Sequence, residues 1–373
     1  MSKNTAVDLF VFGDEFGPAK IIHLHTPSVG LRAVVVIDNV AAGPAIGGTR
    51  MAPDVSVSEC FRLARAMTLK NAACRLRHGG AKSVIFGDPA MPRDQKERLI
   101  RAFACAIAPL VEYIPGPDMG TDEFAMAWIH DEIGRAVGLP AEIGGIPLNE
   151  IGATGFGAAV AAEVAAPFAD LSLNGARVVV QGFGAVGEHV SRFLAKKGAR
   201  LVGVADIAGA ISNPDGIDID ALAELKRAGK SVAAYRNAMA IPGDALVALP
   251  CDIWIPAARP DALRGDNVDR LACKLVVQGA NVAATKDAER RMFERGIVSV
   301  PDFIANAGGV IAGAVEYSGG SEAVALATIE EKIGRNTRLT LKSARAMNIP
   351  PAEAATRLAL DRLRKMSQFK RWR

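Results

Sequence analysis

The sequence has few of the features that mark secreted, membrane-bound or nucleic-acid-binding proteins. Its 373 residues carry a formal net charge of +4 and five cysteines, none of them in a Cys-x-x-Cys pair. No stretch reaches the roughly 18 consecutive apolar residues that a membrane-spanning helix needs, and the first ten residues, MSKNTAVDLF, lack the apolar core of a signal peptide. We therefore expect a soluble, cytoplasmic protein with free thiols rather than a disulfide-stapled secreted domain.

The small net charge also gives the molecule little electrostatic attraction to nucleic acid or to anionic membranes. The local exception is a basic tail at residues 362–373, RLRKMSQFKRWR, which we interpret as a solvated helix end near a subunit contact. No group of histidine, cysteine and acidic residues has the spacing of a metal site. We expect no nucleic-acid, membrane or metal partner.

What the sequence does contain is a dinucleotide-binding βαβ pattern at residues 177–206. An apolar run at 178–180 predicts a buried parallel strand, and a helical segment from Ala185 leads to a second strand that ends at Asp206. The turn between the first strand and the helix has G-x-G-x-x-G spacing and comprises Gly182, Gly184, Ala185, Val186 and Gly187.

Each glycine of this turn has a separate physical task. Gly182 permits the tight turn, Gly184 lets the backbone approach a pyrophosphate, and Gly187 allows close packing of helix on strand. The pyrophosphate would lie at the helix N-terminus. Asp206 can accept hydrogen bonds from the adenosine ribose and would repel a 2′-phosphate, so the pattern favours NAD over NADP.

The length of the chain and the order of its segments predict two domains of α/β class. Before residue 138, strands at 21–25, 32–38, 46–51 and 83–86 mix with a helix opened by a Ser56/Glu59 capping box and with helices at 93–111 and 122–137. A loop of turn residues is expected at 115–121, and the Gly- and Pro-rich stretch 138–152 predicts the crossing between domains.

The second domain is predicted to be a Rossmann-type, mostly parallel, doubly wound sheet. Strand candidates at 252–255, 275–277 and 297–300 alternate with helical or turn segments after the βαβ unit. We expect a substrate-binding and oligomerisation domain at 1–147 and an NAD-binding domain at 148–324. The sequence leaves open whether the helices at about 325–373 pack back on the first domain.

Three ionisable residues of the first domain are candidates for chemistry. Lys70 and Lys82 flank a Gly-containing turn in an otherwise apolar segment, and Asp118 lies in a loop between prolines and glycines. A lysine in a cleft can hold a carboxylate or exchange protons, and an aspartate can act as its partner acid or base. Taken alone, the pattern favours solvated surface lysines and a turn-capping aspartate over a catalytic group.

A series of sequence blocks resembles the Glu/Leu/Phe/Val amino acid dehydrogenase family. The blocks occur in family order and span most of the chain: PAIGGTRM (44–51), MTLKNA (67–72), GGAKSVIFGDP (79–89), GPDMGTDE (116–123), ATGFG (153–157), VQGFGAVG (180–187), CDIWIPAA (251–258), VQGAN (277–281) and PDFIANAGGV (301–310).

The resemblance implies an enzyme that oxidatively deaminates an L-amino acid and that forms a homo-oligomer. Lys70 would bind the substrate α-carboxylate, Lys82 would be the general acid/base acting through water, and Asp118 would carry protons to and from the substrate nitrogen. Three further residues match positions that lie near the nicotinamide and its ribose in the family: Thr154, Asn281 and Asn306.

The substrate is predicted from departures from the glutamate branch. That branch has P-x-K-G-G where this chain has Pro44 to Gly48, so Ile46, beside Gly47, replaces the lysine that pairs with the substrate side-chain carboxylate; Gly313 replaces a serine. An unpaired, desolvated carboxylate is unfavourable, so the pocket is expected to prefer a branched-chain or aromatic side chain. The chain as a whole resembles the leucine/phenylalanine/valine branch most, while the motifs GPDMGT and EIGATGFG are similar to the glutamate branch. The alternatives are glutamate, an unusual amino acid, or a catalytically silent nucleotide-binding regulatory protein.

Overall fold

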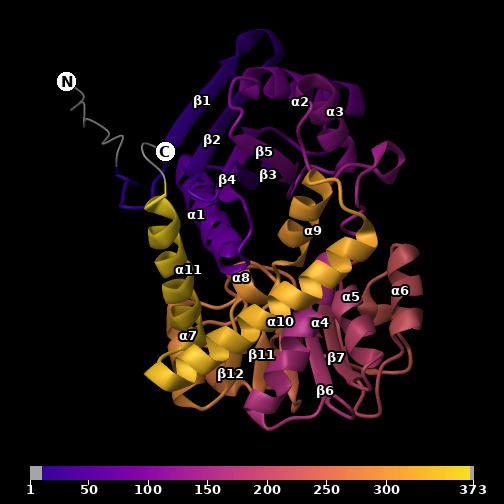
Figure 1. Ribbon diagram of the computed structural model, residues 1–373. Helices are drawn as coiled ribbons and strands as arrows, with labels where there is room; N and C mark the ends of the chain where they lie inside the picture. The colour runs from indigo at the N-terminus through magenta and orange to yellow at the C-terminus, as the bar shows by residue number, and fades with distance from the viewer. Residues whose placement is uncertain (1–10, 370–373) are drawn as a thin grey trace, which may run out of the picture. The chain divides into compact units, whose positions relative to one another are not determined.

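The computed structural model describes residues 11–369, and the chain divides into two compact units (Figure 1). Unit 1 comprises the chain up to residue 147 together with 316–318 and the residues from 359 onward, and unit 2 comprises 148–315 and 319–358. The residues after 318 therefore return to unit 2 and join unit 1 only from residue 359. The first ten residues and the last four of the basic tail lie outside the described residues.

Unit 1 is built on a five-stranded mixed sheet with the strand order β1-β2-β4-β3-β5. The strands are β1 (Lys20–Thr26), β2 (Leu31–Asn39), β3 (Ala45–Ala52), β4 (Gly79–Phe86) and β5 (Tyr113–Pro117), and the helices are α1 (Val57–Ala73), α2 (Arg93–Ile107) and α3 (Glu123–Ile133). Strand β3 runs parallel to both of its neighbours, β4 and β5. Strand β2 is antiparallel to β1 and to β4.

Helices cover both faces of this sheet. One apolar cluster joins α1 to β2 and β4 through Cys60, Ala64 and Val84, and a second joins the opposite face to α2 and α3 through Phe103 and Met126. Burial on both faces explains why β2 carries the unbroken apolar run AVVVI instead of an alternating pattern. Helix α1 begins at the expected capping box, where the Ser56 hydroxyl accepts the Glu59 N–H at 3.1 Å.

Two segments of unit 1 differ from the sequence prediction. Strand β4 begins at Gly79, so Lys82 lies within the strand and not just before it. Gly80 brings α1 close to this strand, since a Cβ there would stand 2.1 Å from the Thr68 backbone nitrogen. The expected loop at 115–121 starts as β5, whose Pro115 and Pro117 are tolerated because β5 is an edge strand.

Unit 2 carries a seven-stranded sheet with the strand order β12-β11-β10-β6-β7-β8-β9. Its strands are β6 (Arg177–Gln181), β7 (Arg200–Asp206), β8 (Gly209–Ser212), β9 (Met239–Ile241), β10 (Ile253–Pro256), β11 (Leu275–Val277) and β12 (Val298–Val300). The remaining helices are α4 (Ala153–Ala165), α5 (Ala185–Ala195), α6 (Ile219–Arg227), α7 (Lys286–Glu294), α8 (Asp302–Ala305), α9 (Gly308–Tyr317), α10 (Glu322–Met347) and α11 (Pro351–Ser367).

The strands from β12 to β7 are parallel, which confirms the doubly wound sheet, and β8 and β9 extend it in antiparallel pairing. Strands β6 and β10 are neighbours although β7 to β9 separate them in sequence. The chain therefore reverses its winding direction between β6 and β10, and ligands of such sheets bind outside the carboxyl ends of the strands at this point. Within the described residues, every helix is too short or too polar to cross a bilayer.

Candidate active site

The two residues predicted to exchange protons form a nearly buried ion pair in unit 1. Lys82 lies in the middle of β4 and Asp118 immediately follows β5, so β3 separates the strands that present them. The Lys82 Nζ is 2.6 Å from Asp118 Oδ2, with 6% of the lysine side chain and 18% of the aspartate side chain exposed. The parallel pairing of β3 with both neighbours thus brings together residues 36 positions apart in the sequence.

Gly48 makes this ion pair possible. It lies in β3 in register with Gly116 of β5, so the Lys82 side chain reaches Asp118 across it. A Cβ at position 48 would stand 2.9 Å from the Asp118 Cβ and 3.0 Å from the Lys82 Nζ. The second glycine of the PAIGGTRM block is therefore needed for space beside the ion pair.

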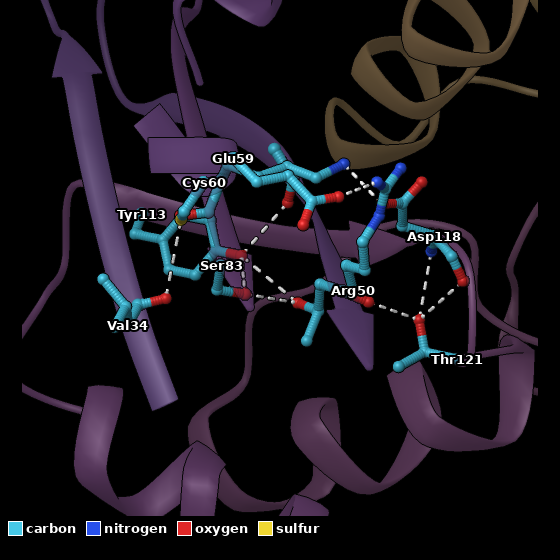
Figure 2. A network of polar contacts seen from close by, with 11 residues as sticks. Val34, Arg50, Glu59, Cys60, Ser83, Tyr113, Asp118 and Thr121 are labelled. Carbon is cyan, nitrogen blue, oxygen red and sulfur yellow. Dashed lines mark hydrogen bonds and ion pairs between the residues drawn. The ribbon is translucent and has the colours of Figure 1, made fainter. Parts of the chain in front are cut away.

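A second cation contacts the same carboxylate. Arg50 follows Gly48 by two residues and so shares its face of β3. The Arg50 Nε donates to Asp118 Oδ2 at 2.9 Å, and its Nη1 lies 2.5 Å from Glu59 Oε1, as Figure 2 shows. The sequence prediction placed Glu59 in a capping box and gave neither Arg50 nor Glu59 a role at this site. The alternation of residues along β3 would have placed Arg50 on the face of Gly48.

The backbone at Asp118 is fixed by the following turn. The Thr121 hydroxyl accepts the Asp118 N–H at 3.0 Å and donates to the Thr49 carbonyl at 2.7 Å (Figure 2). Burial alone would raise the pKa of the Asp118 carboxyl, but the charges of Lys82 and Arg50 and their hydrogen bonds outweigh it and hold the pKa below its ordinary value. Asp118 is therefore a carboxylate at neutral pH.

The opposite face of the same strands holds a buried hydroxyl cluster. The Tyr113 hydroxyl lies 2.8 Å from Ser83 Oγ and 3.2 Å from Thr49 Oγ1, and Figure 2 shows it beside Ser83. Complete burial raises the pKa of Tyr113, so the phenol is neutral. Because the three hydroxyls come from β5, β4 and β3, they tie together the strands that present Lys82, Gly48 and Asp118.

The other residues predicted to bind substrate are distributed between the two units. Lys70 lies in the last turn of α1 and is 8% exposed, and Ile46 is buried in β3. Gly47 has a packing reason to be glycine, because a Cβ there would stand 1.7 Å from the Ala81 carbonyl oxygen. Gly313 is buried in α9, in unit 2.

The glycine-rich turn of unit 2 has the geometry expected for a dinucleotide. Gly182 has a φ of +104°, and a Cβ at Gly187 would stand 1.8 Å from the Gly182 carbonyl oxygen. Gly184, by contrast, faces open space. Helix α5 begins directly after it at Ala185 and receives no side-chain hydrogen bond from its N-cap residue, Gly184. Its first N–H groups and helix dipole suit a pyrophosphate.

The three residues predicted near the nicotinamide belong to two contacting loops and a helix start. Asn306 Nδ2 donates to Asn281 Oδ1 at 3.0 Å. A Cβ at Gly309 would stand 3.2 Å from Thr154 Oγ1, which places the first turns of α9 and α4 against each other. The Asn306 Oδ1 is buried and has no hydrogen-bond partner among the described residues. This acceptor fits a polar ligand at the carboxyl edge of the sheet.

Asp206 ends β7 as predicted, but protein groups already occupy its carboxylate. Its Oδ1 accepts hydrogen bonds from the Ser231 hydroxyl and the Ala208 N–H, and its Oδ2 accepts from the Lys226 ammonium and the Val232 N–H. Burial opposes ionisation, but these hydrogen bonds outweigh it and lower the pKa of Asp206 to about 2.

Two known protein families match the chain. Residues 144–371 match the Glutamate/Leucine/Phenylalanine/Valine dehydrogenase family, and residues 18–135 match the Glu/Leu/Phe/Val dehydrogenase dimerisation domain. The chain belongs to the Glu/Leu/Phe/Val dehydrogenase family. The resemblance inferred from the sequence blocks is thereby confirmed, and the chain is an amino acid dehydrogenase by family.

Individual relatives in this family are named glutamate dehydrogenases. The chain is 39% identical to the NADP(+)-dependent glutamate dehydrogenase of Pyrobaculum calidifontis, over 75% of this chain and 70% of that protein. It is 37% identical to the NAD-specific glutamate dehydrogenase of Staphylococcus aureus, with the same two coverages. The hetero-hexameric glutamate dehydrogenase of Thermus thermophilus, solved in a leucine-bound form, superposes with a TM-score of 0.85 at 30% identity, covering 94% of this chain and 90% of that one.

These relatives do not support the predicted closeness to the leucine/phenylalanine/valine branch, nor the hydrophobic substrate. That prediction rested on the PAIGGTRM block, with Ile46 in it, and on Gly313. The names of the relatives agree better with the alternative of glutamate, for which the contact to the side-chain carboxylate would come from another residue. One of these relatives is named NADP(+)-dependent and another NAD-specific. The comparisons therefore do not decide between NAD and NADP for this chain.

Proposed function

We propose that this family member is a glutamate dehydrogenase that reversibly converts L-glutamate, water and oxidised dinucleotide to the 2-oxo acid, ammonia and reduced dinucleotide. The observation that carries the chemistry is the nearly buried Lys82–Asp118 pair, whose Nζ and Oδ2 are 2.6 Å apart. The choice of glutamate is supported by the names of the relatives, which share 37–39% of aligned residues with this chain.

In the proposed mechanism, the residues of unit 1 bind the amino acid and move its protons. Lys70 holds the α-carboxylate as a point charge. Asp118, ionised beside two cations, takes a proton from the substrate ammonium so that the nitrogen lone pair can assist loss of hydride from Cα. Lys82 first gives its ammonium proton to solvent and, as the neutral amine, removes a proton from the water that attacks the iminium carbon. Asp118 returns the proton that it took to the nitrogen as ammonia leaves.

We propose that unit 2 binds NAD as the hydride acceptor, which is the one chemical role the dinucleotide supplies. The turn of Gly182, Gly184, Ala185, Val186 and Gly187 would hold the pyrophosphate at the start of α5. At the other end of the cofactor, the nicotinamide and its ribose would contact Thr154, Asn281 and Asn306, whose Oδ1 is the buried acceptor without a partner among the described residues.

A second candidate substrate is a hydrophobic L-amino acid, because one observation favours it. Ile46, which is 3% exposed, occupies the position at which glutamate-type enzymes have a lysine. Gly313 occupies the position at which they have a serine. Under this candidate the same lysine and aspartate chemistry acts on a branched-chain or aromatic substrate.

One assay separates these candidates. Reduction of NAD and NADP is measured at alkaline pH across a panel containing L-glutamate, L-leucine, L-valine and L-phenylalanine. Glutamate as the best substrate by kcat/KM supports the proposal, whereas an aliphatic or aromatic optimum overturns it in favour of the second candidate. The Lys82→Ala variant serves as the control for contaminating activity.

The catalytic roles are tested separately by Asp118→Asn. Loss of the proton acceptor is expected to lower kcat by roughly 10²- to 10⁴-fold, the usual contribution of a general acid or base. The affinity of unit 2 for the dinucleotide, measured by calorimetry, is expected to stay at the parental value. A parental protein that binds dinucleotide but turns over no amino acid would instead support the silent regulatory alternative.

We also propose that unit 1 supplies the subunit contacts of a homo-oligomer, as the description of the matching dimerisation domain at residues 18–135 suggests. Light scattering after size exclusion tests this, and a monomer at micromolar concentration would contradict it. The cytoplasmic location expected from the sequence stays a prediction.

A further inference from the structure

The carboxylate of Asp206 has no acceptor position left for a ribose. A carboxylate offers about four lone-pair positions. In Asp206 two protein donors occupy each oxygen: Ser231 Oγ at 2.7 Å and Ala208 N at 3.0 Å on Oδ1, and Lys226 Nζ at 3.1 Å and Val232 N at 2.9 Å on Oδ2. With 8% of its side chain exposed, Asp206 also presents little surface to a ligand.

These contacts give Asp206 a structural task. They tie the carboxyl end of β7 to the loop after α6, where Ser231 caps a short 3₁₀ turn at residues 232–234. To accept ribose hydroxyls, Asp206 would have to give up at least one of its four protein donors, which include the backbone N–H of the buried Val232 and the Ser231 hydroxyl. Releasing a buried partner leaves its donor without an acceptor, which is unfavourable.

Lys226 also changes the charge at this position. The Lys226 ammonium forms an ion pair with the Asp206 carboxylate, so the pair has no net charge. The lysine side chain is 33% exposed and the aspartate side chain 8%, so the cation is the more accessible member. Arg227 and Lys230 are exposed on the same segment. An ammonium has three donors and Lys226 spends one on Asp206, which leaves two for an incoming anion.

We propose that this chain accepts NADP as well as NAD, with Lys226 binding the 2′-phosphate and Asp206 acting as a loop anchor instead of a residue that excludes phosphate. The proposal rests on the dinucleotide site of the proposed function. It reverses the role that the sequence pattern gave to Asp206, because the repulsion of a 2′-phosphate requires an unpaired carboxylate. Lys226 is the specificity-determining residue.

The test measures binding of adenosine fragments, so that it does not depend on turnover. Adenosine 5′-diphosphate and adenosine 2′,5′-bisphosphate are titrated calorimetrically into the full chain at low salt. We expect the two Kd values to lie within roughly tenfold of each other, and Lys226→Gln to weaken only the 2′-phosphorylated probe, by about 10- to 100-fold, the value of a charge-assisted hydrogen bond.

A matched control is Lys197→Gln, which also removes one positive charge from an ion pair, here with Glu163. Lys197 lies just before the start of β7, whereas Asp206 lies at the other end of that strand. Both Kd values should stay parental in this variant. A parental protein that binds the 5′-diphosphate more than about tenfold more tightly than the 2′,5′-bisphosphate overturns the inference, as does an unchanged probe ratio in Lys226→Gln.

The remaining outcomes separate the inference from the proposed function. Binding of neither probe overturns the inference and the dinucleotide site together. Binding of both probes with the expected effect of Lys226→Gln, but without amino acid turnover, supports the inference while the proposed function fails.

Discussion

Two opposing electrostatic effects determine the pKa of Asp118. Burial disfavours its charged form, whereas Lys82 and Arg50, both bonded to Oδ2, favour it and lower its pKa. Arg50 itself is balanced by Glu59, so the group of two cations and two carboxylates has no formal net charge. The carboxylate that we propose as the proton acceptor is thereby kept ionised in a largely buried site, and each of its two cations contributes to that state.

We predict that Arg50→Gln moves the acidic limb of the pH profile to higher pH. Removing one cation raises the pKa of Asp118, so a larger fraction of the enzyme is protonated, and inactive in deamination, at a given acidic pH. The profile of kcat/KM for deamination, recorded from pH 5 to 9, is the measurement. Arg50→Lys keeps the charge and should restore most of the parental profile.

Glu59→Gln is the matched control for this prediction. It leaves both cations on Asp118 and removes only a carboxylate that competes for Arg50. Its acidic limb should lie at or below the parental one. An Arg50→Gln profile that keeps the parental limb, with kcat alone reduced, would show that Arg50 does not act through the charge of Asp118.

At the scale of the elements, the sequence predicted the strand that separates the ion pair but not the pairing that creates it. The PAIGGTRM block predicts β3, and its alternation puts Gly48 and Arg50 on one face. That Lys82 crosses β3 to reach Asp118 depends on the order β4-β3-β5, which joins segments far apart in the chain. Local periodicity carries no information on such non-local pairing.

The strands that the sequence prediction missed are short and depend on their neighbours. Strand β5 contains two prolines, and β8 and β9 have four and three residues. Their pairing partners, not their own composition, determine that they are strands. The partners of Asp206 were missed for the same reason, since Lys226, Ser231 and Val232 follow it by 20–26 residues.

We predict that Gly48→Ala abolishes most turnover while the chain still folds. The added methyl would meet Lys82 Nζ at 3.0 Å and the Asp118 Cβ at 2.9 Å, so the lysine has to move away from the carboxylate. We expect kcat to fall at least tenfold with a Tm decrease of a few degrees, measured by steady-state kinetics and thermal scanning.

Gly243→Ala is the control for this substitution, because a Cβ there meets nothing within 4 Å and its backbone is not left-handed. It should leave kcat and Tm at parental values. Parental turnover in Gly48→Ala would mean that catalysis does not require Lys82 to reach Asp118 across Gly48.

The glycine-rich turn gives a second prediction at this scale, in which two glycines respond differently. A Cβ at Gly187 would collide with the Gly182 carbonyl oxygen at 1.8 Å, so Gly187→Ala should lower Tm clearly. Gly184→Ala adds a methyl into open space. It should keep the parental Tm and weaken dinucleotide binding, measured by calorimetry, because the backbone has to approach the pyrophosphate there. Equal dinucleotide affinity in Gly184→Ala and the parent would contradict a pyrophosphate at this turn.

At the scale of the whole molecule, the composition and block order predicted an α/β enzyme with two units but not the path of the chain between them. Residues 316–318 belong to unit 1 although α9, to which Glu316 belongs, starts in unit 2. The Glu316 carboxylate accepts the backbone N–H groups of Gly138, Leu139 and Ile146 at 3.1 Å each. Such anchoring of a distant loop by one carboxylate leaves no pattern in the sequence.

The pH dependence of unfolding is expected to contain a distinct contribution from Glu289. This residue of α7 is buried, accepts a hydrogen bond from Gln278 Nε2, and has no hydrogen-bond partner for Oε2 among the described residues. Burial raises its pKa to about 7. Between its ordinary pKa and pH 7 the unfolded chain releases this proton while the folded chain keeps it, so stability falls as pH rises through that range.

The loss should reach about 3 kcal/mol above pH 7, since each unit of pKa difference corresponds to about 1.4 kcal/mol. Glu289→Gln keeps the shape of the side chain without a titrating group, so the free energy of unfolding in urea should fall less from pH 5 to pH 8 in the variant than in the parent. All other carboxylates titrate equally in both proteins and cancel in the comparison. Glu294→Gln, an exposed residue at the end of the same helix, controls for charge removal and should follow the parental curve. Parallel curves for Glu289→Gln and the parent would mean that Glu289 is ionised at no cost in the folded protein.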